Sequence, residues 1–392
     1  MKTKKLLLLA TFLFFMGSQV VSSQSKTGDL PVFDFSKDYP QKKVRLQEIA
    51  DIEYVPLETT DDILLGGSSS LSAVTDKYIL VHESRLGDIF VFDRKTGKLY
   101  SQFNHTGSSG MEYSWIKNGT ILDEKAGEIY VCSQYIQVYS LKGEYKRTLK
   151  INGTENGMKI LNFDDESLLI YDDVVLQPGR EKETKKDPYR LVSKKDGSLI
   201  SVLDIHFSKR YSNAIVQKDG NMYRPFKFYY LHNMHYGSDL MIMDISSDTL
   251  YQLSANRELV PVLTRKPSIH ASEPRNIWTP FLTTDKFIQF GTLLLDFNSK
   301  GGKIPTFMYD FKTGEISKLS ILDAEFAVKP YGLGEWEVGS TPSIAKNMAA
   351  ELIQASSMIE AYQKKRLVGN GNKVAKALVE DDNPVVRILK FK

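Results

Sequence analysis

Cysteine is almost absent from this chain of 392 residues: there is one, Cys132, within the stretch EIYVCSQ. A single cysteine cannot form an intramolecular disulfide, so the fold must be stabilised by burial of a core without covalent cross-links. The alternating apolar residues around Cys132 predict a buried thiol in a β-strand, since the sequence shows no neighbouring base that would activate it as a nucleophile. A small disulfide-rich secreted domain is thereby excluded.

Beyond the N-terminus the chain also lacks long apolar runs. Lys2, Lys4 and Lys5 precede a largely apolar stretch over residues 6–16, and the small residues VVSSQS follow, which predicts a secretory signal peptide over residues 1–23. The apolar stretch is too short to span a bilayer, which takes roughly 20 residues. No cysteine follows the predicted cleavage site. We therefore expect a periplasmic or secreted protein that is neither a lipoprotein nor anchored by a transmembrane segment.

An excess of one charge is missing as well. The chain has 51 basic and 48 acidic residues, and removal of residues 1–23 takes away three lysines, so the net charge falls from +3 to zero. A neutral chain gives no electrostatic reason to expect nucleic acid or an anionic membrane as partner. We expect a monomer without a nucleic-acid partner.

Local catalytic motifs are absent too. The sequence has no Gly-x-Ser-x-Gly, no HExxH and no phosphate-binding loop, so the catalytic residues of any enzyme remain unknown. His232 and His235 would point to opposite faces of a strand, and Lys300 occupies a ligand position of the calcium-like stretch DFNSKGG. The sequence thus predicts no metal site and no cofactor. A propeller can still assemble an active site from separate blades, so the absence of a motif does not exclude an enzyme.

What the chain does contain is a repeated hairpin pattern. Five stretches combine a run of alternating apolar residues, a tight turn and a second such run. They are DIFVFDRKTGKLYSQF, IQVYSLKGEYKRTLKI, YRLVSKKDGSLISVLDI, TLYQLSANRELVPVLT and TFMYDFKTGEISKLSI. Their turn residues lie 46, 54, 59 and 58 positions apart, at Gly97, Gly143, Gly197, Asn256 and Gly314. A period of about 40 to 60 residues with several strands in each is typical of a β-propeller.

Further strand-like runs such as KYILVHE precede the hairpins, which predicts four-stranded blades whose two outermost strands are joined by the repeated turn. A sixth blade must then come from the chain ends, DDNPVVRILKFK and KKVRLQEIADIEYVPLET. If both ends share one sheet, the ring closes without exposed edges. We predict an all-β fold, a six-bladed β-propeller that forms a single domain over residues 24–392.

The apolar period changes near the C-terminus. Apolar residues three or four apart predict an amphipathic helix, and NKVAKALVEDD predicts a shorter second one. The residues of the first pattern are Ile344, Met348, Leu352, Ala355, Ile359 and Tyr362. We predict a helical insertion in the closing blade over about residues 343–381, either as a structural cover or as a docking element for a partner protein.

Three stretches carry a resemblance to a known family. IEYVPLETTDD (residues 52–62), SSDTLYQL (246–253) and EDDNPVVRILKF (380–391) resemble an uncharacterised family of exported six-bladed β-propellers of gut Bacteroidota, similar in shape to NHL-type propellers. The resemblance implies the fold and export, and it implies no activity. Family members often have a GxGPGEY loop after the first hairpin. Here GSSGMEY keeps Glu112 and Tyr113 but lacks the Gly-Pro-Gly core.

Candidate ligand-binding residues lie in the loops that would share one face of the propeller, around its central channel. Those loops are residues 104–119, 174–187, 206–220 and 271–280. Loops on a rigid scaffold often carry function, and aromatic or arginine side chains offer flat surfaces to a sugar or peptide. The predicted ligand-binding residues are Glu112, Tyr113, Trp115, Arg275 and Trp278, although blade packing is the competing explanation for both tryptophans.

These observations favour a non-catalytic binding or scaffold module that recognises a glycan or peptide on the channel face. The alternative is a metal-dependent hydrolase or lyase of the lactonase type, with Ca²⁺ as the candidate ion in the channel. A partner-binding hub that works through the helical insertion is a third hypothesis. All three rest on analogy of fold.

Overall fold

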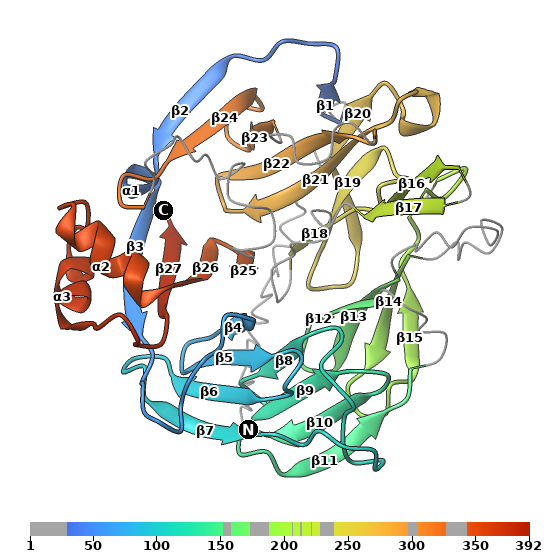
Figure 1. Ribbon diagram of the computed structural model, residues 1–392. Coiled ribbons are helices and arrows are strands. Elements are labelled where there is room, and N and C mark those ends of the chain that lie inside the picture. Colours follow the sequence, from blue (N-terminus) through green and yellow to red (C-terminus); the bar gives the residue numbers. More distant parts are fainter. Residues whose placement is uncertain are drawn as a thin grey trace, which may run out of the picture.

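The computed structural model is a ring of six β-sheets around a central axis (Figure 1). It describes residues 30–151, 158–172, 188–205, 207–211, 214–220, 222–227, 239–296, 305–326 and 343–392. The predicted signal peptide lies outside these residues. The prediction of an all-β six-bladed propeller is confirmed, and no helix of the described part is long and apolar enough to cross a membrane.

The first three blades are antiparallel sheets of four strands each, in simple sequential order. Blade 1 contains β4 (Ser69–Val74), β5 (Tyr78–Glu83), β6 (Ile89–Asp93) and β7 (Leu99–Phe103). Blade 2 contains β8 (Thr120–Asp123), β9 (Glu128–Cys132), β10 (Ile136–Ser140) and β11 (Tyr145–Leu149). Blade 3 contains β12 (Met158–Asn162), β13 (Ser167–Asp172), β14 (Tyr189–Ser193) and β15 (Leu199–Val202). Cys132 is completely buried in β9, as predicted.

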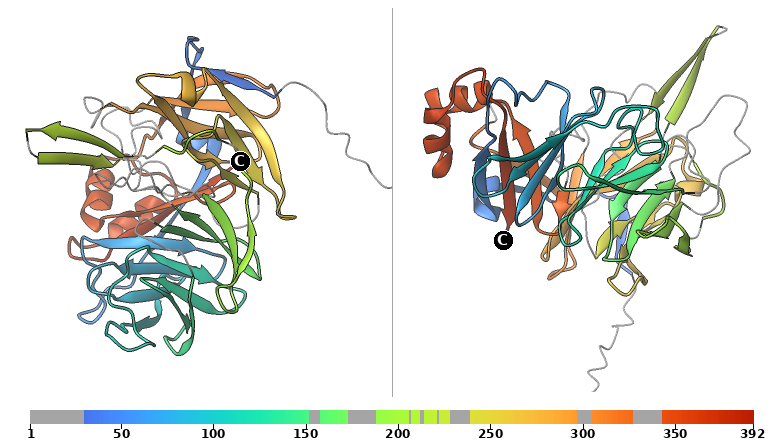
Figure 2. Two further views of the ribbon diagram at one scale, coloured as in Figure 1. Left: turned by 90° about the vertical axis from the view of Figure 1, so that its right-hand side faces the viewer. Right: turned by 90° about the horizontal axis from the view of Figure 1, so that it is seen from below.

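Blades 4 and 5 each gain an additional outer strand from the N-terminal segment. Blade 4 contains β18 (Leu240–Ile242), β19 (Thr249–Leu253), β20 (Leu259–Lys266) and the parallel strand β1 (Val32–Asp34). Blade 5 contains β21 (Asn276–Thr283), β22 (Phe287–Leu294), β23 (Thr306–Asp310), β24 (Ile316–Leu322) and the parallel strand β2 (Gln41–Arg45). A separate hairpin, β16 (Ala214–Asp219) with β17 (Met222–Lys227), projects away from the ring (Figure 2).

Blade 6 closes the ring with both ends of the chain, as predicted. It contains β25 (Ser343–Ala345), β26 (Met348–Ile353), β27 (Val385–Phe391) and β3 (Ala50–Pro56), which follows the short helix α1 (Leu46–Ile49). β3 pairs with β27 in antiparallel register, with Val55 opposite Val386. Of the two N-terminal runs, only the second therefore joins the closing blade, whereas the first, as β2, extends blade 5.

The five repeated hairpins are the outermost repeat strands of blades 1 to 5, as predicted. In blades 1, 2, 3 and 5 the turn has a glycine with positive φ, for example Gly97 at 71° and Gly314 at 72°. In blade 4 the residue in this conformation is Arg257 (φ 66°), and not the predicted turn residue Asn256. Arg257 instead forms an ion pair with Asp164 of blade 3, at 2.8 Å.

The predicted helical insertion is shorter than expected. Residues 343–353 form β25 and β26, so the helical prediction is wrong there; helices α2 (Ala355–Gln363) and α3 (Asn370–Ala377) follow. Met348 and Leu352 are four residues apart, and four is an even number, so a strand also places both on one face. Both pack against the core shared with blade 1. The helices lie outside the closing blade, where Met358 and Ala375 pack near Tyr54 (Figure 1).

The hydrophobic core is a ring of apolar clusters, one at each junction between neighbouring blades. At the junction of blades 4 and 5, for example, Phe33 of β1 packs against Trp278 and Phe290. Full burial of one such side chain contributes about 1.5 to 3 kcal/mol to stability. The blades therefore form a rigid frame that positions the loops at its two faces.

Candidate functional site

The most completely described loop of the predicted site joins β7 to β8 and covers residues 104–119. It lies on the face that carries the loops between blades, which we call the loop face. Asn104 Nδ2 donates hydrogen bonds to Leu86 O (2.8 Å) and to Asp88 Oδ1 (2.9 Å) in the loop between β5 and β6. The two loops therefore support each other above blades 1 and 2.

Tyr113 anchors this loop from inside. Its side chain is almost fully buried, and its hydroxyl donates to Gly87 O (2.7 Å) and accepts from the backbone N–H of His105 (3.0 Å). Burial raises the pKa of Tyr113 to about 12, so the hydroxyl stays protonated and remains a donor. Tyr113 thus has a packing role that leaves almost no side-chain surface for a ligand.

Glu112 fixes the turn at the tip of the loop. Its carboxylate accepts a hydrogen bond from the backbone N–H of Ser109 (2.9 Å), which lowers the pKa of this half-buried acid. A Cβ atom at Gly107 would come within 2.1 Å of the same carboxylate, so a larger residue there would displace the Glu112 side chain. The loop is therefore ordered by Glu112 and Tyr113 without the Gly-Pro-Gly core that family members often have.

Trp115 is the residue that the ordered loop displays. Its side chain is 48% exposed, while the next residue, Ile116, is buried and donates its N–H to Ser84 O (3.2 Å). Other exposed apolar residues lie on loops of the same face. They are Leu86 between β5 and β6, Met111 on the same loop, and Tyr135 between β9 and β10. Blades 1 and 2 thus present an aromatic ring on a fixed backbone.

The other two predicted residues lie in a different part of the ring. Trp278 of β21 is buried in the core between blades 4 and 5, with its ring stacked 6.0 Å from that of Phe33. Arg275 lies on the loop before β21, where its guanidinium group stacks 4.3 Å from the centre of the Tyr211 ring and pairs with Glu273. The structure therefore separates the predicted site into Trp115 on blades 1 and 2 and Arg275 between blades 4 and 5.

Sequence reasoning missed a buried polar group on the inner strands of blades 1 and 2. His82 Nδ1 lies 2.6 Å from Ser72 Oγ, which in turn lies 2.7 Å from Thr120 Oγ1. Burial lowers the pKa of His82 to about 4, so the ring is neutral at pH 7. Its other nitrogen meets Ser84 Oγ at 3.1 Å, so no carboxylate orients the ring. The only sequence signal was a histidine within an apolar strand.

Metal ligands do not converge in the part of the chain that the structure describes: no three His, Cys, Asp or Glu residues there could hold an ion together. The weak candidates His232 and His235 lie outside the described residues, as do residues 174–187 of the predicted loop face.

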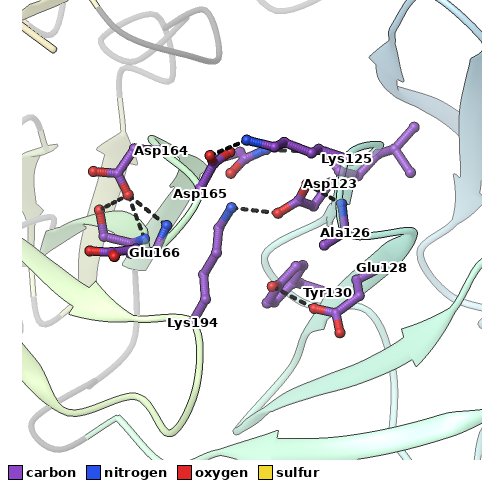
Figure 3. A network of polar contacts seen from close by, with 12 residues as sticks. Asp123, Lys125, Ala126, Glu128, Tyr130, Asp164, Asp165, Glu166 and Lys194 are labelled. Atoms are coloured by element: carbon purple, nitrogen blue, oxygen red, sulfur yellow. Dashed lines mark hydrogen bonds and ion pairs between the residues drawn. The ribbon is translucent and has the colours of Figure 1, made fainter.

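A polar cleft of about 490 Å³ separates blades 2 and 3 (Figure 3). Lys194 of blade 3 reaches across to Asp123 of blade 2, at 2.6 Å, and both side chains are buried. Glu128 accepts two hydrogen bonds of 2.7 Å from Arg147 and one of 2.9 Å from Tyr130. Burial raises the pKa of Glu128, but these hydrogen bonds outweigh it and lower the pKa to about 2. The cleft is thus walled by charges that pair with one another.

A second cavity, of about 620 Å³, lies between α3 and the turn of the first hairpin. Pro56, Val374 and Leu378 contribute apolar surface, and Lys98 and Lys373 contribute charge from its two walls. The cavity lies beside the joint between blade 6 and blade 1.

Comparison with known proteins agrees with the architecture. A solved structure of a Bacteroides fragilis protein that is assigned as exported has 13% sequence identity and a TM-score of 0.57, and the match covers 90% of this chain and 99% of that chain. This likeness shows the shared fold alone. BamB from Moraxella catarrhalis (10% identity, TM-score 0.33, covering 82% and 84%) and streptogramin B lyase (9%, 0.32, 70% and 92%) score too low to support an argument.

No curated protein matches the chain. One family model does match, the domain of unknown function DUF4934, and it extends over residues 30–390, from just before β1 to within one residue of the end of β27. Because this match spans all six blades, the chain belongs to the DUF4934 family.

Proposed function

We propose that the protein is an exported binding module that recognises a glycan or a peptide on its loop face, with Trp115 as the central contact. The observation that carries this proposal is the half-exposed Trp115 ring on a loop fixed by buried hydrogen bonds. Export is supported by the N-terminal sequence pattern and by the assignment of the Bacteroides fragilis neighbour.

The loop that carries Trp115 is already ordered before a ligand binds. An indole ring offers a large flat surface to a sugar ring or a peptide side chain, and its N–H can donate a hydrogen bond. Ordering a loop on binding costs free energy, and a loop that is already ordered avoids that cost. Tyr113 and Glu112 therefore contribute as positioning residues. Arg275 is the second predicted contact, for a ligand long enough to extend across the loop face.

The test uses residues 24–392 and an array of host and plant glycans, together with a displayed random peptide library. Ligands that bind are then titrated calorimetrically against the wild type and Trp115→Ala. We expect Trp115→Ala to weaken binding at least tenfold, or about 1.4 kcal/mol, as is common for a central aromatic contact.

Tyr100→Ala is the matched control, because Tyr100 is an exposed aromatic residue on the outer strand β7, at the rim of blade 1. It should bind like the wild type. The proposal fails if no glycan or peptide binds, or if every ligand that binds is held equally well by Trp115→Ala.

A further inference from the structure

The outer edges of the six blades differ in whether an additional strand pairs with them. In blades 4 and 5 the edges of β20 and β24 are covered by β1 and β2, two short parallel strands from the distant N-terminal segment. In blades 1, 2 and 3 the outermost strands of the described sheets are β7, β11 and β15 (Figure 1). The rim of this propeller therefore accepts added strands. In blade 6 the outermost strand is β3, and helix α3 packs beside it, with Ala375 near Tyr54. Among the described residues, the edges of blades 1, 2 and 3 carry neither an added strand nor a helix.

Two of these three edges are protected. β11 carries Lys146 and Arg147, and charged residues on an edge strand discourage pairing with another chain. At the start of β7, the backbone N–H of Leu99 already donates to the Glu58 carboxylate (2.7 Å). Ser101 of β7 also donates its hydroxyl to Leu141 O in the turn of blade 2.

The third edge, β15, has neither protection in the part of the chain that the structure describes. Its sequence is Leu-Ile-Ser-Val, without a charged residue or a proline. Leu199, Ile200 and Val202 are 60%, 39% and 42% exposed. An apolar edge strand that is open to solvent is a template for strand pairing.

The backbone of β15 is oriented for such pairing. Leu203 N–H donates to Tyr189 O, across to β14 (3.0 Å). Because N–H and C=O groups alternate in direction along a strand, those of the preceding residue, Val202, point to the open side. The polar cleft between blades 2 and 3 lies directly beside this edge, with Ile200 in its wall.

We propose that β15 binds an extended segment of a partner polypeptide, which pairs with it as an added outer strand of blade 3, as β1 and β2 do on blades 4 and 5. In this mode the main chain provides affinity and alternate side chains provide specificity. The partner segment has apolar residues against Leu199 and Val202. Between them it has polar residues that face the charged wall of the cleft.

Other occupants fit less well. The stretch between the predicted cleavage site and the first described residue, Gln-Ser-Lys-Thr-Gly-Asp over residues 24–29, has no apolar residue to match this edge. Self-pairing of a four-residue strand between two copies buries far less than the roughly 1,200 Å² of a stable dimer. A separate polypeptide is therefore the occupant to which we commit.

The experiment selects octapeptides from a phage-displayed random library on residues 24–392. We expect peptides with alternating apolar residues, and slower amide exchange at Val202 when such a peptide is bound. Val202→Pro removes the outward N–H but leaves the hydrogen bond of Leu203, so it should weaken binding more than tenfold. Val202→Lys, which places a charge on the edge, should do the same if the proline variant does not fold.

Tyr100→Lys on β7 is the matched control and should bind the selected peptides like the wild type. Trp115→Ala should also leave this binding unchanged, which separates the edge from the proposed loop-face site. The inference is overturned if no peptide is selected, or if the selected peptides bind Val202→Pro and Val202→Lys as well as the wild type. It is also overturned if sedimentation shows a wild-type dimer that Val202→Lys abolishes, because the occupant is then a second copy.

Discussion

At the scale of single residues, the turn glycines of the hairpins are required for two different structural reasons. Gly97 and Gly314 share the same backbone conformation, with φ near 70°, but their surroundings differ. A Cβ atom at Gly97 would lie 1.9 Å from Pro56 O, at the end of β3, whereas a Cβ atom at Gly314 would meet nothing within 4 Å. Only the first glycine is also needed for contact between blades.

We therefore predict that Gly97→Ala is much more destabilising than Gly314→Ala. Both variants force alanine into the left-handed region, which costs about 1 to 2 kcal/mol. Gly97→Ala must in addition displace the backbone of Pro56, so we expect it to lose at least twice as much stability. Urea unfolding of both variants measures the difference. Equal losses would show that the contact with β3 is not important.

The acid Glu128 gives a pH-dependent contribution to stability. Its pKa is about 2 in the folded protein, below its ordinary value of 4.5, so the folded state favours the ionised form. This stabilisation is complete above about pH 4.5 and is lost as the pH falls towards 2. Its partner Arg147 is partly open to solvent, which limits the size of the effect.

We predict that Glu128→Gln makes the decline of stability between pH 4.5 and 2 shallower than in the wild type. The free energy of unfolding, measured against pH, checks this. Glu144→Gln is the control, since Glu144 is an exposed acid on the same hairpin that forms no ion pair among the described residues. If the two variants have the same slope, the pairing of Glu128 with Arg147 does not contribute.

At the scale of elements, β1 depends on one side chain. The strand has three residues, of which Phe33 is buried among Trp278, Phe290 and Phe307. Val32, the preceding residue, points outward and is exposed. Three backbone pairings alone do not hold a strand in place, so the aromatic cluster must do so.

We predict that Phe33→Ala lowers the free energy of unfolding by about 3 to 5 kcal/mol and shifts the fluorescence of Trp278 to longer wavelength. Val32→Ala should cost less than 1 kcal/mol, because its side chain is already in water. Limited proteolysis near residues 30–40 provides a second readout. A mild effect of Phe33→Ala on all three measures would contradict the assigned role of the strand.

The elements also show what the sequence could and could not predict. The five hairpins were predictable because alternation and turn chemistry are local signals. Residues 343–353 were assigned to a helix because a spacing of four suits a helix and a strand alike. The sheet that β1 joins was not predictable, since its partner β20 is more than 200 residues away in the sequence. The hydrogen bonds of His82 and Tyr113 likewise depend on contacts between segments.

At the scale of the whole molecule, the ring is closed by contacts between the two chain ends. Asn383, just before β27, donates hydrogen bonds of 2.7 Å to Glu58 O and Ile63 O and accepts one of 2.8 Å from the N–H of Leu65. The first and last of the stretches that resemble the propeller family thus contact each other directly.

A cross-link at this closure should stabilise the protein. Asp51 and Lys390 are directly opposite in the β3–β27 ladder and both are exposed, and opposed residues in such a ladder suit the geometry of a disulfide. We predict that Asp51→Cys with Lys390→Cys, once oxidised, unfolds at a higher temperature, with a gain of about 2 to 4 kcal/mol. Cys132 is buried and should not interfere.

The reduced form of the same variant is the control. It should melt close to the wild type, because among the described residues the substituted side chains form surface ion pairs alone, which contribute about 0 to 1 kcal/mol. If oxidation leaves the melting temperature unchanged, separation of the two chain ends is not an early step of unfolding.

The pairing of the N-terminal strands determines how early the propeller can fold. β1, β2 and β3 are made before the blades that they join, and β27, the partner of β3, lies more than 300 residues further along the chain. Such long-range pairings form slowly because the intervening chain must first be ordered. The propeller therefore cannot close until β27 has been made, and in a polypeptide that crosses a membrane before folding, β3 can pair with β27 only after both strands have crossed.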